Sequence, residues 1–166
     1  IRAYDAAETT YLETVNKYVE FADPYGELPV PAKANYDFVG WYTAGGTKIN
    51  AEDSVAVSTS TTVYSKWTPT TYTVTFDANG GFFDGDTTVT TKKVATTFDT
   101  TITPPAAAPT RAGYEFLGWA ASAEDAASKT TVTSWPTLQT EDAVTYYAVW
   151  NATIWDCLLY TSDAAD

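Results

Sequence analysis

Carboxylates are the only side chains in this sequence whose types and spacing could carry catalysis. The chain of 166 residues contains no histidine, which excludes a Ser-His-Asp arrangement and imidazole metal ligation, and its one cysteine cannot build a thiolate zinc site. A pair of carboxylates could cleave a glycosidic bond if a cleft held the two groups about 5 to 10 Å apart. Three close acidic pairs are the candidates: Asp84 with Asp86, Glu124 with Asp125, and Glu141 with Asp142. All three fall in expected loops, where such charges are usually solvated, so we expect no catalytic residue and no enzyme.

The segment DANGGFFDGD, residues 77–86, places four oxygen ligands in a glycine-rich loop: Asp77, Asn79, Asp84 and Asp86. These are calcium ligands, but the EF-hand loop requires an acid or amide at its fifth position and a glutamate at its twelfth. Here those positions are Gly81 and Thr88. Because Asn-Gly is well suited to β-hairpin turns, we interpret the segment as a hairpin turn and predict no metal site and no cofactor.

The charge balance argues against nucleic acid and lipid surfaces as partners. Nine basic residues against 21 acidic residues give a net charge of -12. Such a chain is repelled by phosphate backbones and by anionic lipids. No apolar run approaches the roughly 18 residues that a membrane span needs, so we expect no membrane insertion in this segment.

Two stretches of the chain repeat each other, PAKANYDFVGW at 31–41 and PTRAGYEFLGW at 109–119. Identical residues recur at a constant offset: Pro31, Ala34, Tyr36, Phe38, Gly40 and Trp41 return as Pro109, Ala112, Tyr114, Phe116, Gly118 and Trp119. Charge and apolarity persist where identity does not, since Arg111 replaces Lys33 and Leu117 replaces Val39. Each copy then closes on an aromatic segment, TVYSKW ending at Trp67 and TYYAVW ending at Trp150. The chain therefore contains two copies of one structural unit.

Threonine and β-branched residues dominate both copies, and Gly, Pro, Asn and Asp interrupt them at short intervals. This pattern predicts a mainly β protein built from two tandem small β-sheet modules, residues 1–68 and 70–152. The segment 71–77 alternates aromatic and apolar residues with threonine and is expected to be a strand before the turn at Asn79. One helix is expected at 122–129, where Ser122 is a good N-cap, and we interpret it as a surface insertion because the first copy lacks it.

The Gly-Trp pair at the end of each repeated stretch predicts a β-bulge. Strict alternation would place Trp119 on the solvent side with Glu115, away from Phe116. One extra residue at Gly118 returns the indole to the core, because a bulge changes the facing of every later residue. We expect the same at Gly40 and Trp41. The four tryptophans of the two copies are assigned to core packing, with ligand stacking as the alternative: Trp41, Trp67, Trp119 and Trp150.

Three aromatic residues of the second copy lack clear partners in the first copy: Phe82, Phe83 and Trp135. Aromatic residues added at loops can anchor a ligand, so these three are the candidate ligand-binding residues. For Trp135 core packing is the alternative. Exposure of all three side chains together would favour a binding function.

On TVTFDANGG, PTRAGYEFLGW and TYYAVW, the second copy resembles the Listeria-Bacteroides repeat, also called the internalin-type B repeat. The first copy resembles it through YGELPVPAKANYDFVGWYTAGGTKI and TVYSKW, but its opening IRAYDAAETTYLETV departs from the family's Asn-Gly-Gly turn. The resemblance covers nearly all of residues 1–152. It implies a small β-grasp-like module, α+β at most, repeated in tandem along secreted or wall-attached bacterial surface proteins.

The resemblance implies a non-catalytic spacer or stalk that is also an adhesion element, with adjacent repeat modules as its partners. Two alternatives remain: a specific binding module for a host protein or glycan, and an accessory repeat of a large secreted enzyme. An extracellular location, secreted or attached to the cell wall, follows from the resemblance alone.

The C-terminal segment has no counterpart in either copy. CLLYTSDAAD, residues 157–166 beginning at Cys157, resembles a translated sequencing adapter, so we expect an artefact of read-through in a metagenomic fragment. Residues 153–156 parallel the segment after Trp67 and could begin a third module. The parent protein is expected to be longer than this chain.

Overall fold

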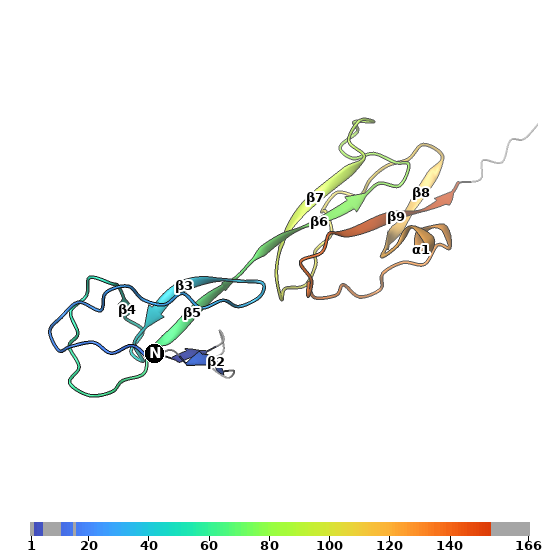
Figure 1. Cartoon of the computed structure of the whole chain (residues 1–166). Helices are drawn as coiled ribbons and strands as arrows, with labels where there is room; N and C mark the ends of the chain where they lie inside the picture. Colours follow the sequence, from blue (N-terminus) through green and yellow to red (C-terminus); the bar gives the residue numbers. More distant parts are fainter. Residues whose placement is uncertain (1, 5–10, 15, 154–166) are drawn as a thin grey trace, which may run out of the picture. The chain divides into compact units, whose positions relative to one another are not determined.

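The structure is a computed structural model that describes residues 2–4, 11–14 and 16–153 (Figure 1). Before residue 16 only the backbone of two strands is described. Regular structure within these residues consists of nine strands and one short helix. The prediction of a mainly β protein is confirmed, whereas the predictions for residues 157–166 and for most of 153–156 lie outside the described residues.

The chain divides into two compact units. Unit 1 comprises Ile1–Tyr72 together with Thr97–Asp99 and Gln139–Glu141, and unit 2 comprises Thr73–Thr96, Thr100–Leu138 and Asp142–Asp166. Each unit has its own sheet and its own buried aromatic residues. Two small β modules therefore follow each other in the chain, as the repeat predicted.

Unit 1 contains a two-stranded and a three-stranded sheet. Strands β1 (Arg2–Tyr4) and β2 (Tyr11–Thr14) pair antiparallel. Strand β3 (Tyr36–Tyr42) lies between β4 (Lys48–Ile49) and β5 (Tyr64–Pro69) and is antiparallel to both. Because β3 is central, its residues are covered from both edges and it carries the buried Trp41.

Unit 2 is built on a four-stranded sheet in the order β7-β6-β9-β8. The strands are β6 (Thr71–Asp77), β7 (Thr91–Thr97), β8 (Tyr114–Ala120) and β9 (Val144–Ala152). Strand β9 is parallel to β6 and antiparallel to β8. A mixed sheet with its first and last strands parallel at the centre is the β-grasp-like arrangement that the resemblance implied. The central place of β9 explains its nearly continuous apolar sequence, since both of its faces are covered.

The predicted bulge is present in the first copy. Phe38 is opposite Trp67, but the next paired residue, Gly40, is opposite Lys66, so Val39 is the extra residue on β3. The backbone of Gly40 has φ 147°, a value that side chains with a Cβ rarely adopt. Trp41 consequently faces the core with Phe38, and 1% of its surface is exposed.

The second copy repeats this geometry. Phe116 is opposite Trp150 and Gly118 is opposite Val149, with the same one-residue shift and φ 144° at Gly118. Trp119 is 6% exposed. The bulge prediction is therefore confirmed in both copies, and so is the assignment of all four repeated tryptophans to core packing: Trp41, Trp67, Trp119 and Trp150 are buried.

The short helix α1 (Ala123–Ala127) begins where its cap predicted. The Ser122 hydroxyl accepts a hydrogen bond from the backbone N–H of Asp125 at 3.0 Å and donates one to its carboxylate at 2.7 Å. The interpretation as a surface insertion is wrong in one respect. Ala126 is buried against Ala120 and Val149, so the helix covers part of the core of unit 2.

Candidate functional site

The glycine-rich loop after β6 contains two tight turns. In the first, Asn79 and Gly80 have φ 48° and 86°, and the N–H of Gly81 donates to the carbonyl of Ala78 at 3.0 Å. In the second, Asp84 and Gly85 have φ 57° and 74°. The tight turn at Asn79 is confirmed, but it does not join neighbouring strands directly. Residues 78–90 separate β6 from β7, and the first turn brings the chain to a backbone bridge between Phe82 and Thr110.

The oxygen atoms of this loop hold its own turns together. Asp77 accepts from the N–H of Asn79 at 2.7 Å, and Asp84 forms an ion pair with Lys92 at 2.9 Å. Asp86 accepts from the hydroxyl of Thr88 at 2.7 Å and from its N–H at 2.9 Å, and these bonds, the hydroxyl first, lower the pKa of the exposed Asp86 carboxyl. Within the described residues no group of three or more His, Cys, Asp or Glu side chains could hold a metal ion.

The acidic pairs do not meet across a cleft. Asp84 and Asp86 are exposed on the second turn, and Glu141 and Asp142 are exposed between β8 and β9. Asp125 is the capping partner of α1. Among the described residues, none of those that line the two hollows of unit 1 is a carboxylate.

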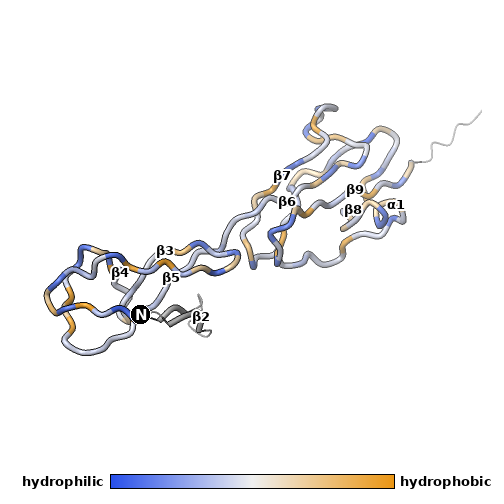
Figure 2. The backbone as a smooth tube through the Cα atoms, viewed as in Figure 1, coloured by the Kyte–Doolittle hydropathy of each residue, from blue (hydrophilic) through white to orange (hydrophobic). Residues whose placement is uncertain are grey.

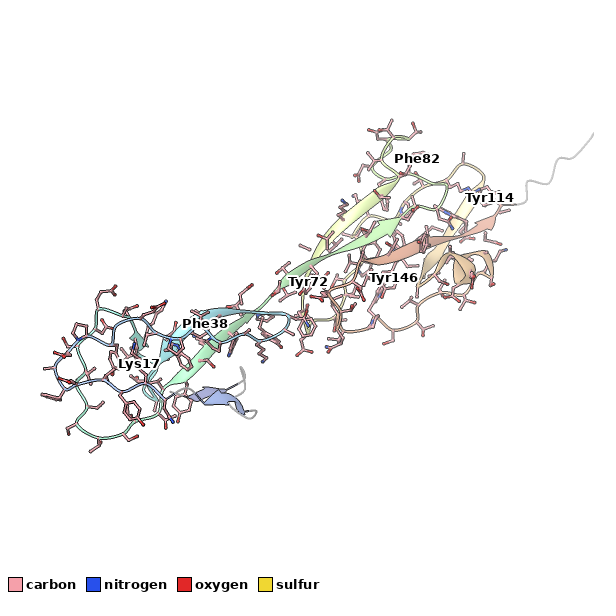
Figure 3. The ribbon with its side chains drawn as sticks, in the orientation of Figure 1. Lys17, Phe38, Tyr72, Phe82, Tyr114 and Tyr146 are labelled. Carbon is pink, nitrogen blue, oxygen red and sulfur yellow. The ribbon has the colours of Figure 1, made fainter. Side chains whose placement is uncertain are left out.

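The three candidate ligand-binding aromatics are not exposed together. Phe83 is fully buried, and its ring stacks on Trp119 with centroids 6.2 Å apart. Trp135 is half-buried and meets the ring of Tyr146 at 4.9 Å. Phe82, which Figure 3 labels on the loop between β6 and β7, is also half-buried. Phe83 and Trp135 thus contribute contacts to the aromatic interior of unit 2, and Phe82 is held by its backbone bridge.

Among the residues that the structure describes, the most exposed aromatic side chains lie in unit 1, and sequence analysis missed them. Tyr18 is 94% exposed and Phe21 is 65% exposed, and both line an open hollow of about 510 Å³. Figure 2 shows apolar stretches in the loops of this unit as well as in its strands. The core residues Trp41, Ile49 and Val63 also line the hollow. The available signal was that residues 16–30 carry aromatics without strand alternation and without a counterpart in the second copy.

Hydroxyl groups form another part of the wall of this hollow. Residues 58–61 read Ser-Thr-Ser-Thr, and Asn16 and Lys17 complete the polar part. Lys17 donates a hydrogen bond to the carbonyl of Glu27. A smaller hollow of about 290 Å³ lies beside β5 and includes Tyr42 and Lys66.

The fold and these sites define a tandem β-module protein with a separate aromatic core in each module. The sequence model of the Listeria-Bacteroides repeat domain matches residues 3–66 and 72–149. The chain belongs to this family and contains two tandem copies of its repeat.

Curated relatives share the repeat but are much longer. Internalin H of Listeria monocytogenes is 38% identical over 95 residues, which are 56% of this chain and 16% of that protein. A protein described as a putative membrane protein of Evansella cellulosilytica is 33% identical over 101 residues, 60% of this chain and 14% of that protein. The chain thus spans a small fraction of the relatives that it matches. No solved structure matches the chain.

Within the described residues, no helix has the length and hydropathy needed to cross a membrane.

Proposed function

We propose that the chain is a non-catalytic spacer segment of a secreted or wall-attached bacterial surface protein and is also an adhesion element of that protein. The observation that supports the spacer role is that the residues repeated in both copies build the fold. Trp41 and Trp119 fill cores, and Gly40 and Gly118 form bulges. A binding site common to both copies would require recurring side chains that are exposed and available.

The recurring side chains nearest the surface are engaged with each other. Lys33 lies over the ring of Tyr36 at 3.9 Å, and Arg111 lies over the ring of Tyr114 at the same distance. This contact explains why a cation is kept where its identity changes, since either cation is attracted to the face of the ring. The residues shared by the two copies therefore have structural roles, and they do not form a common exposed binding site.

The remaining support comes from relatives and from charge. The match to Internalin H and to a protein described as a membrane protein supports a place on a bacterial surface. A net charge of -12 favours solubility of the exposed modules. We assign residues 1–68 and 70–152 to the two modules, with adjacent repeats of the parent chain as their partners.

Display on a Gram-positive cell surface tests the spacer function. The chain would be inserted between a wall anchor and an epitope, in one and in two consecutive copies. A spacer increases antibody access to the epitope as copies are added. Access that does not change with copy number would contradict the proposal. A flexible linker with the same number of residues and the same net charge is the control.

A second candidate is a binding module for a host glycan or protein, and the exposed aromatics of unit 1 favour it. A rim of Tyr18 and Phe21 beside a row of hydroxyl groups combines apolar contact with hydrogen bonding, as binding pockets do. If the hollow binds, the chain will attach to host cells, and Tyr18→Ser with Phe21→Ser will abolish attachment. Val30→Ser is the matched control, because Val30 is also exposed but does not line the hollow.

A further inference from the structure

Both copies contain the same β-turn immediately before the Gly-Trp strand. The N–H of Tyr36 donates to the carbonyl of Lys33 at 3.2 Å, and the N–H of Tyr114 donates to that of Arg111 at 3.1 Å. The third residue of each turn has positive φ, 65° at Asn35 and 76° in the second copy. We call residues 33–36 and 111–114 the exit turns, because each binds the chain where it leaves its copy.

The chain that leaves each copy is bound by the same turn of that copy. The N–H of Thr70, directly after β5, donates to the carbonyl of Asn35 at 2.9 Å. The N–H of Thr153, directly after β9, donates to the carbonyl of Gly113 at 2.9 Å. The two copies therefore release the chain beside equivalent surfaces.

In the first copy this surface is covered by residues that follow later in the chain. The ring of Phe98 meets the ring of Tyr36 edge-on at 5.6 Å, and the N–H of Phe98 donates to the carbonyl of Thr70 at 2.9 Å. The hydroxyl of Tyr72 donates to the side chain of Asn35 at 2.8 Å. Tyr72 and Phe98 lie in the second family match but belong to unit 1.

In the second copy the equivalent surface is exposed among the described residues. Tyr114 is 39% exposed and Leu117 is 44% exposed, whereas Tyr36 and Val39 at the same positions are half-buried. The only ring or cation contact recorded at Tyr114 within the described chain is Arg111 from its own turn. The second exit turn thus has the geometry of the first without the residues that cover it.

We propose that the second exit turn is the docking surface for a third module of the same family, whose residue equivalent to Phe98 packs on Tyr114. This inference rests on the proposed spacer function, because it concerns how one repeat accepts the next. The occupant follows from the first copy, where the covering residues come from the repeat that continues the chain. Covalent connection also gives a following module a high effective concentration at this surface.

One residue makes the second surface different from the first. Asn35 accepts the hydroxyl of Tyr72, but Gly113 has no side chain to accept an equivalent hydroxyl. Docking at the second turn therefore relies on the aromatic contact and the backbone. Asn tolerates positive φ better than most residues, so Gly113→Asn restores the missing acceptor with little strain.

An extended chain tests the proposal. A copy of residues 71–152 would be placed directly after Thr153, and Tyr114→Ser would be compared in the extended and the original chains. We expect the substitution to lower the midpoint of thermal unfolding by about 4 to 8 °C in the extended chain, the size expected when one contact between aromatic rings is lost. In the original chain we expect a smaller decrease, because there the ring loses only its contact with Arg111. Tyr18→Ser is the matched control, since this exposed tyrosine should be neutral in both chains.

Equal effects of Tyr114→Ser in both chains, or no effect in either, would overturn the proposal. Gly113→Asn gives an independent test, because it should raise the midpoint only in the extended chain. These measurements use purified protein, whereas the spacer function is measured on cells. If Tyr114→Ser has the same effect in both chains while epitope access still increases with copy number, the docking proposal is rejected and the spacer function is not.

Discussion

The two Gly-Trp strands have the same backbone but different surroundings. In unit 2 the ring of Trp119 lies 5.0 Å from Phe76, 5.3 Å from Phe116 and 6.2 Å from Phe83. In unit 1 Trp41 packs with Ile49 and Val63 and forms part of the wall of an open hollow. The Trp119 indole is therefore enclosed by three aromatic rings, whereas the Trp41 indole contacts the ring of Phe38 at 5.6 Å together with aliphatic side chains.

This difference shows that the repeated residues determine the strand pairing, whereas the loops determine which side chains complete each core. The repeated residues set the bulge and the register, since Phe38 meets Trp67 as Phe116 meets Trp150. The Trp67 indole donates to Ser65 at 2.9 Å, whereas the Trp150 indole donates to the carbonyl of Ala78 at 2.9 Å, so even the partners of equivalent atoms differ. A short repeated stretch thus builds a strand pair, and unrelated loops complete each core.

The largest expected effect comes from removing either indole. Trp119→Ala and Trp41→Ala should each cost about 3–5 kcal/mol of stability, with Trp119→Ala at the upper end because three rings lose their contact. Because each unit has its own core, each loss should be confined to one unit. Hydrogen exchange of backbone amides measures this unit by unit. Equal loss of protection in both units after one substitution would mean that the cores are coupled.

The bulge glycines distinguish backbone strain from crowding. Gly40→Ala and Gly118→Ala both force a Cβ onto a backbone near φ 145°, which should cost about 1–3 kcal/mol. A Cβ at 118 would lie 3.2 Å from Thr131, and one at 40 would lie 2.8 Å from the flexible end of Lys48. Equal losses in urea unfolding indicate strain, and a larger loss at 118 indicates crowding. Gly45→Ala is the control, because Gly45 has no positive φ and its Cβ would make only an ordinary contact, at 3.7 Å from the Thr43 hydroxyl.

Alkaline pH should destabilise unit 2 through Tyr146. Burial raises the pKa of this phenol, which stacks on Phe76 at 5.6 Å. The unfolded chain ionises near pH 10, while the folded unit resists ionisation, so stability is complete below about pH 10 and is lost as the pH rises further. Tyr146→Phe should reduce this loss and leave stability at pH 7 nearly unchanged. Denaturant midpoints between pH 8 and 11.5 measure it, and the same alkaline loss in both proteins would contradict the assignment.

The smallest expected effect is at the stacked cations. Lys33→Gln and Arg111→Gln should each cost about 0.5–1 kcal/mol, because the ring of Tyr36 or Tyr114 loses its cation. Arg111→Lys should keep most of the contact. If Lys33→Gln and Arg111→Gln have no effect on thermal unfolding, the persistence of a cation at this position needs another explanation.

The strands, the bulges and the buried tryptophans could be predicted because each depends on a pattern within a few residues. Period-2 alternation and a glycine before Trp119 were sufficient for the facing of that indole. The burial of Phe83 could not be predicted in the same way, because it depends on a stack with Trp119 from a distant strand. Tyr18 and Phe21 lie in a segment with neither strand alternation nor a repeat, so no local rule indicated their exposure.

Parallel pairing of β6 with β9 has a mechanical consequence. These strands begin and end the second repeat, and Val74 to Asp77 pair in register with Val144 to Tyr147. A pull on the two ends of this repeat would load the hydrogen bonds between these strands in shear, so that they must break together and not one after another. The arrangement favours resistance to tension, which a tether between a cell and a moving surface would experience.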